Sequence, residues 1–285
     1  MTATRSPATY EAVEWLSGAD RLRYADYWND EEEERRKPFW VLDGDFSRME
    51  AYLTEIGLPA QMEESVRVAR VRFGRGLDGV GVDLGAGTLW AVPYLFRLGT
   101  VDHVYCVEYS RHRLLKLGPA VLEHYGVSSD RVTLALGDIH RLRLADHSVD
   151  FVFLSAAFHH SDTPGALLSE IRRVLRPSGL VIVTGEHMTD GTRPDRLRHM
   201  AKFVASRVLP GAIQQRLFGR LLQVARLMPR DEDLSSGDDR LGDHEYTLAQ
   251  YEQLFSASGF VSQNVRRDGW AFQAFVLTPG GESAS

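Results

Sequence analysis

Two glycines and a distant carboxylate have the spacing of a nucleotide-binding site. The segment Val82-Asp-Leu-Gly-Ala-Gly-Thr88 places Gly85 and Gly87 directly after a short apolar run. Glycine lets the backbone turn tightly and approach a ligand closely. Glu108 follows about 23 residues after Gly85. From that position a carboxylate can accept hydrogen bonds from both hydroxyls of a ribose, so the pattern favours an adenosine-containing ligand.

The identity of residue 90 argues against a bound dinucleotide. A dinucleotide fingerprint requires Gly or Ala there, because helix and strand must touch beside the pyrophosphate. Trp90 occupies the position, and its indole would block that contact. An NAD(P)-dependent oxidoreductase is therefore kept only as an alternative, beside the simpler interpretation that the glycines form a structural turn.

Two pairs of titratable residues follow later apolar runs. His159 and His160 form the first pair, and Glu186 and His187 form the second. Histidine titrates in the range that a general base requires, so we treat these four as candidate catalytic residues, with capping or packing as the alternative role. A metal site built from the histidines and Asp162 matches no known ligand spacing, and we predict none.

The elements that must position these residues alternate between strand and helix. Apolar segments predict strands over 80–84, 101–107, 131–136, 149–154 and 180–184. Amphipathic segments predict helices over 90–98, 111–125 and 164–175. Strands that are apolar throughout and alternate with helices are typical of a parallel sheet covered on both faces. Ligands of such sheets bind beyond the carboxyl ends of the strands, where all of the polar motifs fall.

The flanking segments predict three further parts. We expect helix from Tyr10 to about residue 73, and a closing helix over 248–258 followed by a β-hairpin over 260–277. The predicted fold is α/β, with a Rossmann-like, doubly wound, mostly parallel sheet of seven strands and a C-terminal hairpin. We divide the chain into a helical N-terminal cap, a core in two pieces, and a helical insertion that forms a lid or a dimer interface: 1–75, 76–188 with 246–279, and 189–245.

Aromatic residues near the N-terminus are candidates for an acceptor pocket. The residues expected to contact a substrate are Tyr24, Tyr27, Trp28, Trp40 and Phe158. Aromatic side chains provide large apolar contact area with a polar edge, which suits a bulky, partly apolar molecule. Simple packing within the cap is the alternative.

Composition restricts the class of protein. The chain has 285 residues, 44% of them hydrophobic, and a formal net charge of −6, which disfavours bulk nucleic-acid binding. Cys106 is the only cysteine, so an internal disulfide and a cysteine metal cluster are excluded. The start of the chain has no apolar core of signal-peptide length, and the longest apolar stretch, 151–158, is too short to cross a bilayer. We therefore expect a cytoplasmic protein.

Five segments in order resemble the motifs of class I S-adenosylmethionine (SAM)-dependent methyltransferases. They are Val82–Thr88, Val107–Ser110, Gly137–Ile139, Asp150–Ser155, and Phe158–His160 followed by Leu168–Leu180. The resemblance covers about residues 79 to 184 and again the closing helix and hairpin. Two positions depart from the family pattern. Leu89 stands where many members have a third glycine, and Ser178 replaces a glycine before the fifth strand.

The resemblance implies SAM as cofactor and S-adenosylhomocysteine as product. Asp83 and the backbone of Gly85, Ala86 and Gly87 would hold the amino acid end, and Glu108 would hold the ribose. The remaining implied cofactor contacts concern the adenine and the sulfonium. Tyr109 would flank the adenine, Asp138 and Ile139 after Gly137 would bind its edge, and Ser155 and Ala156 would line the floor near the sulfonium.

The resemblance also implies methyl transfer to an O or N atom of a small molecule, with a specialised metabolite as one candidate. Enzymes that methylate nucleobase amines usually carry an Asn-Pro-Pro-Tyr-like stretch after the fourth strand. This chain has Leu154-Ser-Ala-Ala157 there, which disfavours nucleic-acid substrates. We expect neither nucleic-acid nor membrane partners, while a homodimer stays open. Two alternatives remain: a catalytically silent SAM-fold binding protein, and a protein that uses the sulfonium of SAM for cyclisation or decarboxylation.

Overall fold

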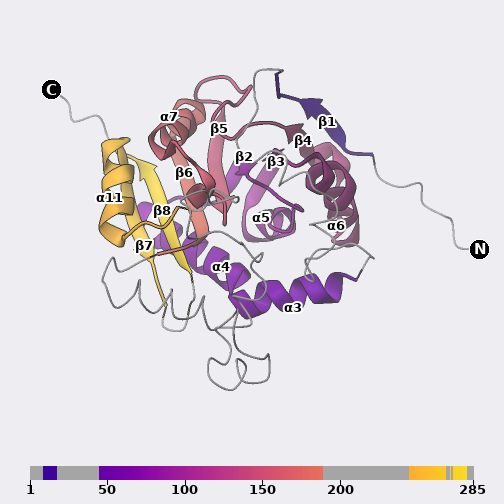
Figure 1. Ribbon diagram of the computed structural model, residues 1–285, viewed down its shortest axis with the longest axis horizontal. Coiled ribbons are helices and arrows are strands. Elements are labelled where there is room, and N and C mark those ends of the chain that lie inside the picture. Colours follow the sequence, from indigo (N-terminus) through magenta and orange to yellow (C-terminus); the bar gives the residue numbers. More distant parts are fainter. Residues whose placement is uncertain (1–8, 18–44, 189–243, 268–269, 271, 281–285) are drawn as a thin grey trace, which may run out of the picture.

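An eight-stranded sheet forms the centre of the protein (Figure 1). The computed structural model describes residues 9–17, 45–188, 244–267, 270 and 272–280. The strands are β1 (Glu11–Glu14), β2 (Asp78–Leu84), β3 (Thr100–Glu108), β4 (Val132–Leu136), β5 (Val149–Ser155), β6 (Leu175–Glu186), β7 (Phe260–Val265) and β8 (Gln273–Pro279). The α-helices are α3 (Phe46–Ile56), α4 (Leu58–Val68), α5 (Val92–Leu98), α6 (Gly118–His124), α7 (Pro164–Val174) and α11 (Leu248–Ala257). Short helical turns are η1 (Ala69–Phe73), η2 (Arg113–Leu117), η3 (Ser129–Arg131) and η4 (Phe158–His160).

The strand order reverses at β2. The sheet runs β1-β4-β3-β2-β5-β6-β8-β7, so β3 and β4 lie on one side of β2 while β5 and β6 lie on the other. These central strands pair in parallel, and β8 and β7 add an antiparallel hairpin. This is the doubly wound sheet with a C-terminal hairpin that the sequence predicts. A reversal of this kind opens a crevice at the carboxyl ends of the strands, where ligands bind.

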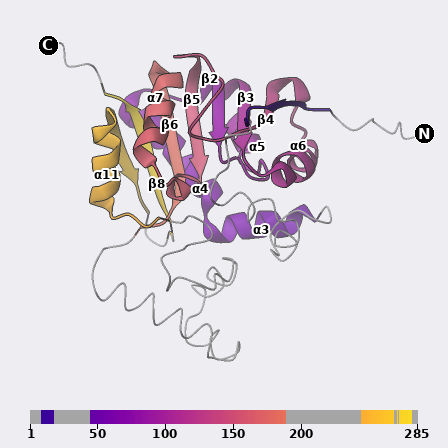
Figure 2. The same cartoon turned by 45° about the horizontal axis from the view of Figure 1, so that its top comes forward.

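Two hydrophobic cores cover the two faces of the sheet. Helices α3 to α6 bury one face, through side chains such as Met62 and Leu95. Helices α7 and α11 bury the other, through Ile171 and Phe255. Figure 1 shows α7 and α11 on one side of the strands and α4 and α5 on the other, and Figure 2 shows the same layers after rotation. Within the described ranges, no helix combines the length and the apolar character needed to span a bilayer.

The first described element is a strand, so the expectation of helix from Tyr10 is wrong at residues 11–14. Strand β1 pairs in parallel with β4 and extends the predicted seven strands to eight. Val13 and Trp15 alternate with exposed residues and turn toward the core under α7. This period of two, combined with pairing to the edge of β4, outweighs the local helical preference.

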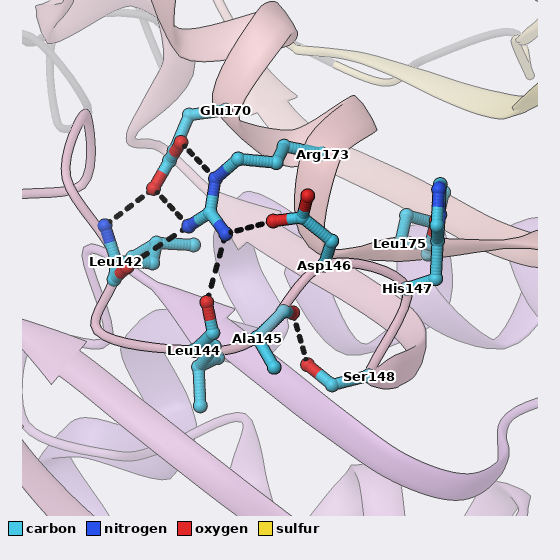
Figure 3. A network of polar contacts seen from close by, with 9 residues as sticks. All are labelled: Leu142, Leu144, Ala145, Asp146, His147, Ser148, Glu170, Arg173 and Leu175. Carbon is cyan, nitrogen blue, oxygen red and sulfur yellow. Dashed lines mark hydrogen bonds and ion pairs between the residues drawn. The ribbon is translucent and has the colours of Figure 1, made fainter.

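Arg173 of α7 holds the loop between β4 and β5 in place (Figure 3). Its guanidinium donates to the carbonyls of Leu142 and Leu144, at 3.0 and 2.8 Å, and to the carboxylate of Asp146 at 2.7 Å. Glu170, one helical turn earlier, binds the same guanidinium and also accepts from the N–H of Leu142 at 2.6 Å. The loop that leaves the end of β4 is thus fixed at its far end by charge-assisted bonds.

A glycine in β2 makes room for an aromatic ring of β5. Gly81 and Phe151 are register partners, and a methyl group on Gly81 would collide with the fully buried ring. We predict that Gly81→Ala lowers the free energy of unfolding by about 1–3 kcal/mol, since overpacking forces the ring or the strand to shift. Urea denaturation would measure the loss.

The matched control is Gly165→Ala, at an exposed position of α7 where an added methyl group meets nothing within 4 Å. Alanine is the better helix former, so this variant should keep or slightly raise stability. Equal stability of Gly81→Ala and the wild type would contradict the tight approach of β2 and β5.

Candidate functional site

The chain bends sharply after β2 through three left-handed residues. Gly85, Gly87 and Leu89 have φ angles of 66°, 53° and 65°. The N–H groups of Gly85 and Ala86 both donate to the carbonyl of Val107, at 2.9 and 3.1 Å, which ties the bend to the end of β3. A Cβ at position 85 would also lie 2.7 Å from the Cβ of Ala157, which follows β5. Glycine is therefore required at 85 by conformation and by space.

Leu89 adopts a left-handed backbone conformation, which favours glycine. Many members of the family that this chain resembles have glycine at this position. The leucine side chain is fully buried in the core beneath α5 and α6. Gly118, the first residue of α6, leaves room for it, because a Cβ there would lie 2.5 Å from the leucine Cδ1. Burial of the leucine offsets the strain of its backbone, so this departure from the family pattern has a packing reason.

Glu108 fastens the bend to the end of β3. Its side chain is buried, and one carboxylate oxygen accepts from the N–H of Gly87 at 2.8 Å. The other oxygen accepts from the N–H of Ser110 at 2.7 Å, and the hydroxyl of Ser110 in turn accepts from the N–H of Arg113 at the start of η2. An ionised carboxylate has about four lone-pair sites, so two further hydroxyl donors can still bind. The predicted meeting of Glu108 and the glycine bend is thus found.

Asp83 is a buried acid with an unsatisfied oxygen. It lies in β2, 2% exposed, and its Oδ2 has no hydrogen-bond partner among the described residues. Burial, and secondarily the charge of Glu108, raises the pKa of Asp83 to about 8. Because a lone ionised carboxylate is costly in a low-dielectric interior, this position gains most from a cation placed against it.

Further unsatisfied hydroxyls lie at the same edge of the sheet. Ser155 and Thr184 are register partners at the ends of β5 and β6, and neither hydroxyl finds a partner in the described part of the chain. The same holds for Thr88 in the bend. Ala156 is exposed with a φ of 50°, and its N–H donates to the carbonyl of Thr184 at 2.8 Å. Buried polar atoms without partners mark a place where a polar ligand can satisfy them.

The end of β4 joins this group. The N–H of Gly137 donates to the carbonyl of Glu108 at 3.1 Å, which sets Asp138 beside the end of β3. Oδ1 of Asp138 accepts from the N–H of His140 at 2.9 Å and contacts its ring Nδ1 at 2.8 Å. Tyr109 and Ile139 are half-buried nearby in the chain. The sequence-predicted cofactor residues therefore all lie at or directly after the carboxyl ends of β2, β3, β4 and β5.

The four candidate catalytic residues form one cluster. Glu186, at the end of β6, is fully buried and accepts from the N–H groups of Phe158 and His159, at 3.2 and 3.1 Å. Nδ1 of His159 contacts the same carboxylate at 3.0 Å. The ring of His159 lies 4.3 Å from that of His160 and 4.7 Å from that of His187, centre to centre. The sequence singled out these residues separately, and the fold brings them together.

The protonation states in this cluster follow from its charges. Burial alone would raise the pKa of Glu186, but His159, His187 and His160 together outweigh it and lower the pKa. The hydroxyl of Tyr251, on α11, lies 3.2 Å from Glu186 and 2.9 Å from the carbonyl of His187. Burial and the nearby carboxylate raise the pKa of Tyr251 well above its usual range. Glu186 therefore stays an acceptor and Tyr251 a donor near neutral pH.

Of the candidate substrate residues, Phe158 lies within the described ranges. Phe158 is fully buried and packs against the rings of Phe255 at 5.6 Å and Tyr251 at 6.0 Å, in the core under α11. In this arrangement its ring contacts protein, and a role in acceptor binding stays a prediction. The other four, Tyr24, Tyr27, Trp28 and Trp40, lie outside the described residues.

Three polar residues of the site were not predicted. Tyr251 lies in an ordinary amphipathic helix, so its pattern signals packing. His140 stands two residues after Asp138, and this spacing was the one sequence feature that indicated a contact between them. His244 donates its N–H to the carbonyl of His159 at 2.8 Å, and its ring contacts Asp162 at 3.0 Å. Tyr251 and His244 reach the site only through tertiary structure, whereas His140 also contacts Asp138 locally.

Comparison with known proteins identifies the domain. Residues 82–183 match a family described as a methyltransferase domain. A curated relative, dimethylglycine N-methyltransferase of Parasynechococcus marenigrum (strain WH8102), is 28% identical over 149 residues, which cover 48% of this chain and 51% of that protein. The chain spans about half the length, or less, of the curated relatives it matches.

Solved structures share the fold at low identity. A chain in the complex between the Trm112 methyltransferase activator of Haloferax volcanii and a methyltransferase has a TM-score of 0.53 and 15% identity, covering 91% of this chain and 99% of that one. A SAM-dependent methyltransferase structure from Methanococcus maripaludis has a TM-score of 0.52 and 12% identity, covering 95% and 100%. The chain therefore carries a methyltransferase domain at residues 82–183, within a fold that it shares with SAM-dependent methyltransferases, and SAM is the cofactor that this domain implies.

Proposed function

We propose that this protein binds SAM at the carboxyl ends of β2 to β5 and transfers its methyl group to an O or N atom of a small-molecule acceptor. The observation that carries the proposal is Asp83, a buried acid with a raised pKa and an unsatisfied oxygen beside the glycine bend. A site of this kind is costly to the fold alone, and strongly perturbed acids in a crevice are frequent at functional sites.

The donor and acceptor groups fit SAM. An ammonium group of the methionine end would give Asp83 the cation it lacks, and the unsatisfied hydroxyls of Ser155 and Thr88 suit the polar atoms around it. Glu108 has acceptor capacity left for ribose hydroxyls. Asp138 would accept from the adenine amino group. When bound, SAM supplies an electrophilic methyl group, and the protein must align an acceptor atom with it and exclude water.

The histidine cluster suits removal of a proton from the acceptor. Because the Glu186 carboxylate only accepts hydrogen bonds, Nδ1 of His159 carries its proton and Nε2 is the basic nitrogen. His159 is buried, whereas its neighbour His160 is half-buried. We propose that one of these two takes the proton, that Glu186 orients His159, and that His187 contributes to acceptor binding. A base is required only where the acceptor must lose a proton before or during attack.

The small-molecule acceptor rests on the strand-end sequence and on the curated relative. That relative is named as an N-methyltransferase of dimethylglycine, a small amine. After β5 this chain carries Ala156-Ala157 in place of the proline-containing stretch of nucleobase-amine methyltransferases. Within the predicted cap of residues 1–75, β1 pairs with β4, and α3 and α4 cover one face of the sheet. The insertion 189–245, proposed as a lid or a dimer interface, lies outside the described residues except for 244 and 245. We further propose a cytoplasmic location.

Two other functions make different predictions. An NAD(P)-dependent oxidoreductase would bind NAD and not SAM, and the family match opposes it. A catalytically silent binding protein would bind SAM but form no methylated product. The carboxylates at 83, 108 and 138 fit that alternative as well as a methyltransferase, so only product formation separates the two. Titration with SAM and NAD, followed by product mass, separates all three.

The first prediction concerns Asp83. Asp83→Asn should weaken S-adenosylhomocysteine binding by at least about tenfold, because a charged hydrogen bond to the ammonium group is lost. In the wild type, affinity should rise with pH between about 6 and 8 and then level off, since the ligand binds the ionised form of an acid whose pKa is about 8. Calorimetry in buffers of different ionisation enthalpy should detect the released proton.

The matched control is Asp78→Asn, at the exposed start of the same strand. It should leave affinity and its pH dependence unchanged. Affinity that is independent of pH, or unaffected by Asp83→Asn, would place the ammonium group elsewhere.

The second prediction concerns Glu186. Glu186→Gln should lower the free energy of unfolding at pH 7 by about 2–4 kcal/mol, because buried N–H donors lose a charged acceptor. The folded-state pKa of Glu186 is lowered, so its stabilisation is present above the unfolded pKa of about 4 and is lost as pH falls through the folded value. Denaturant titrations at pH 7 and near pH 3 should therefore show a difference between variant and wild type that shrinks in acid.

Glu252→Gln, at an exposed position on α11, is the control and should change stability by less than about 0.5 kcal/mol. A Glu186→Gln variant as stable as the wild type would mean that the carboxylate is not ionised in the folded protein.

A further inference from the structure

His140 links the ends of two strands that lie on opposite sides of the switch point. Its Nδ1 contacts Oδ1 of Asp138 at 2.8 Å, after β4. Its Nε2 contacts the hydroxyl of Ser161 at 2.7 Å, just after η4 and β5. The main-chain N–H of His140 donates to the same Oδ1 at 2.9 Å. The proposed chemistry uses Asp138 but gives His140 no role.

The two bonds to Oδ1 fix the orientation of the Asp138 carboxylate. An ionised carboxylate only accepts, so Nδ1 of His140 is the donor and Nε2 is available to the Ser161 hydroxyl. The χ2 torsion of aspartate has a broad energy profile, and without such bonds the carboxylate plane would vary. The side chains of Asp138 and His140 are 16% and 21% exposed, which limits competition from water. The direction of Oδ2 is thereby set as well.

Ser161 is a rigid anchor for this bridge. It is fully buried, and its N–H donates to the carbonyl of Phe158 at 3.1 Å. On its other side, Asp162 contacts the ring of His244 at 3.0 Å. The segment 158–162 is thus held from within and from the chain before α11. Because Ser161 holds Nε2 of the imidazole in place, Nδ1 at the other side of the ring holds Oδ1 of Asp138 in a fixed position.

We infer that His140 is a positioning residue that aims Asp138 at the adenine amino group and so makes the cofactor site selective for adenine over a deaminated base. The inference rests on the proposed function, which assigns the adenine edge to Asp138. Adenine offers an amino donor at this edge, whereas hypoxanthine offers a carbonyl oxygen. A carboxylate held in place accepts a hydrogen bond from the amino group and is repelled by the carbonyl oxygen. A carboxylate that is free to rotate can turn away from the carbonyl oxygen, and the difference between the two bases becomes smaller.

The test compares S-adenosylhomocysteine with its deaminated analogue, S-inosylhomocysteine, by calorimetry. The wild type should prefer the adenosine ligand by at least about tenfold. In His140→Ala the affinity for S-adenosylhomocysteine should fall toward that for the analogue, whose own affinity should hold or rise. A purely structural role of His140 would lower both affinities together and leave the preference intact.

Conservative variants separate the two halves of the bridge. His140→Asn retains a donor near the position of Nδ1 but cannot reach Ser161, whereas Ser161→Ala removes only the anchor. Both should retain an intermediate preference. The control is His103→Ala, since His103 likewise contacts a hydroxyl, that of Thr133 at 3.0 Å, but far from the carboxyl ends of the strands. It should leave the preference unchanged.

Each outcome has a distinct meaning. Full preference in His140→Ala, or equal loss of both affinities, overturns the inference while the proposed function stands. Equal binding of both ligands by the wild type also overturns it, because Asp138 would then not read the amino group. A wild type that binds neither ligand refutes the proposed function and this inference with it.

Discussion

The burial of two carboxyl groups side by side governs the site. Asp83 in β2 and Glu108 at the end of β3 lie where the sheet reverses direction. Glu108 is satisfied by two backbone N–H groups of the bend and of the segment after β3, whereas Asp83 keeps an unsatisfied oxygen and a raised pKa. An arrangement of this kind is unfavourable without a cation, and a cofactor that carries positive charge reverses the balance.

The rest of the fold serves to hold this pair and extend it. The glycine bend packs on the end of β3, and the end of β4 is bonded to Glu108 through Gly137. Arg173 fixes the far end of the loop after β4, and His140 fixes its near end against Ser161. On the acceptor side, Glu186 gathers backbone and histidine donors. The cofactor edge and the histidine cluster are thus joined by short hydrogen-bonded links.

The sequence predicted the parts of the structure that depend on local pattern. Apolar runs identified the parallel strands, and strand-end polar motifs located Asp83, Glu108 and Asp138. Strand β1 was missed because its four residues acquire their conformation only by pairing with β4. Tyr251 was missed because its contact with Glu186 joins residues 65 positions apart, and the link from His140 to Ser161 was missed because it joins residues 21 positions apart. Local sequence carries no signal for such contacts.

The most direct measurement is a crystal structure of the full chain with S-adenosylhomocysteine. The account predicts the ligand amino group within hydrogen-bonding distance of the Asp83 carboxylate, the ribose hydroxyls on Glu108 and the adenine amino group on Asp138. A ligand bound elsewhere, with Asp83 still lacking a partner and the crevice beside the bend filled by protein side chains, would contradict it.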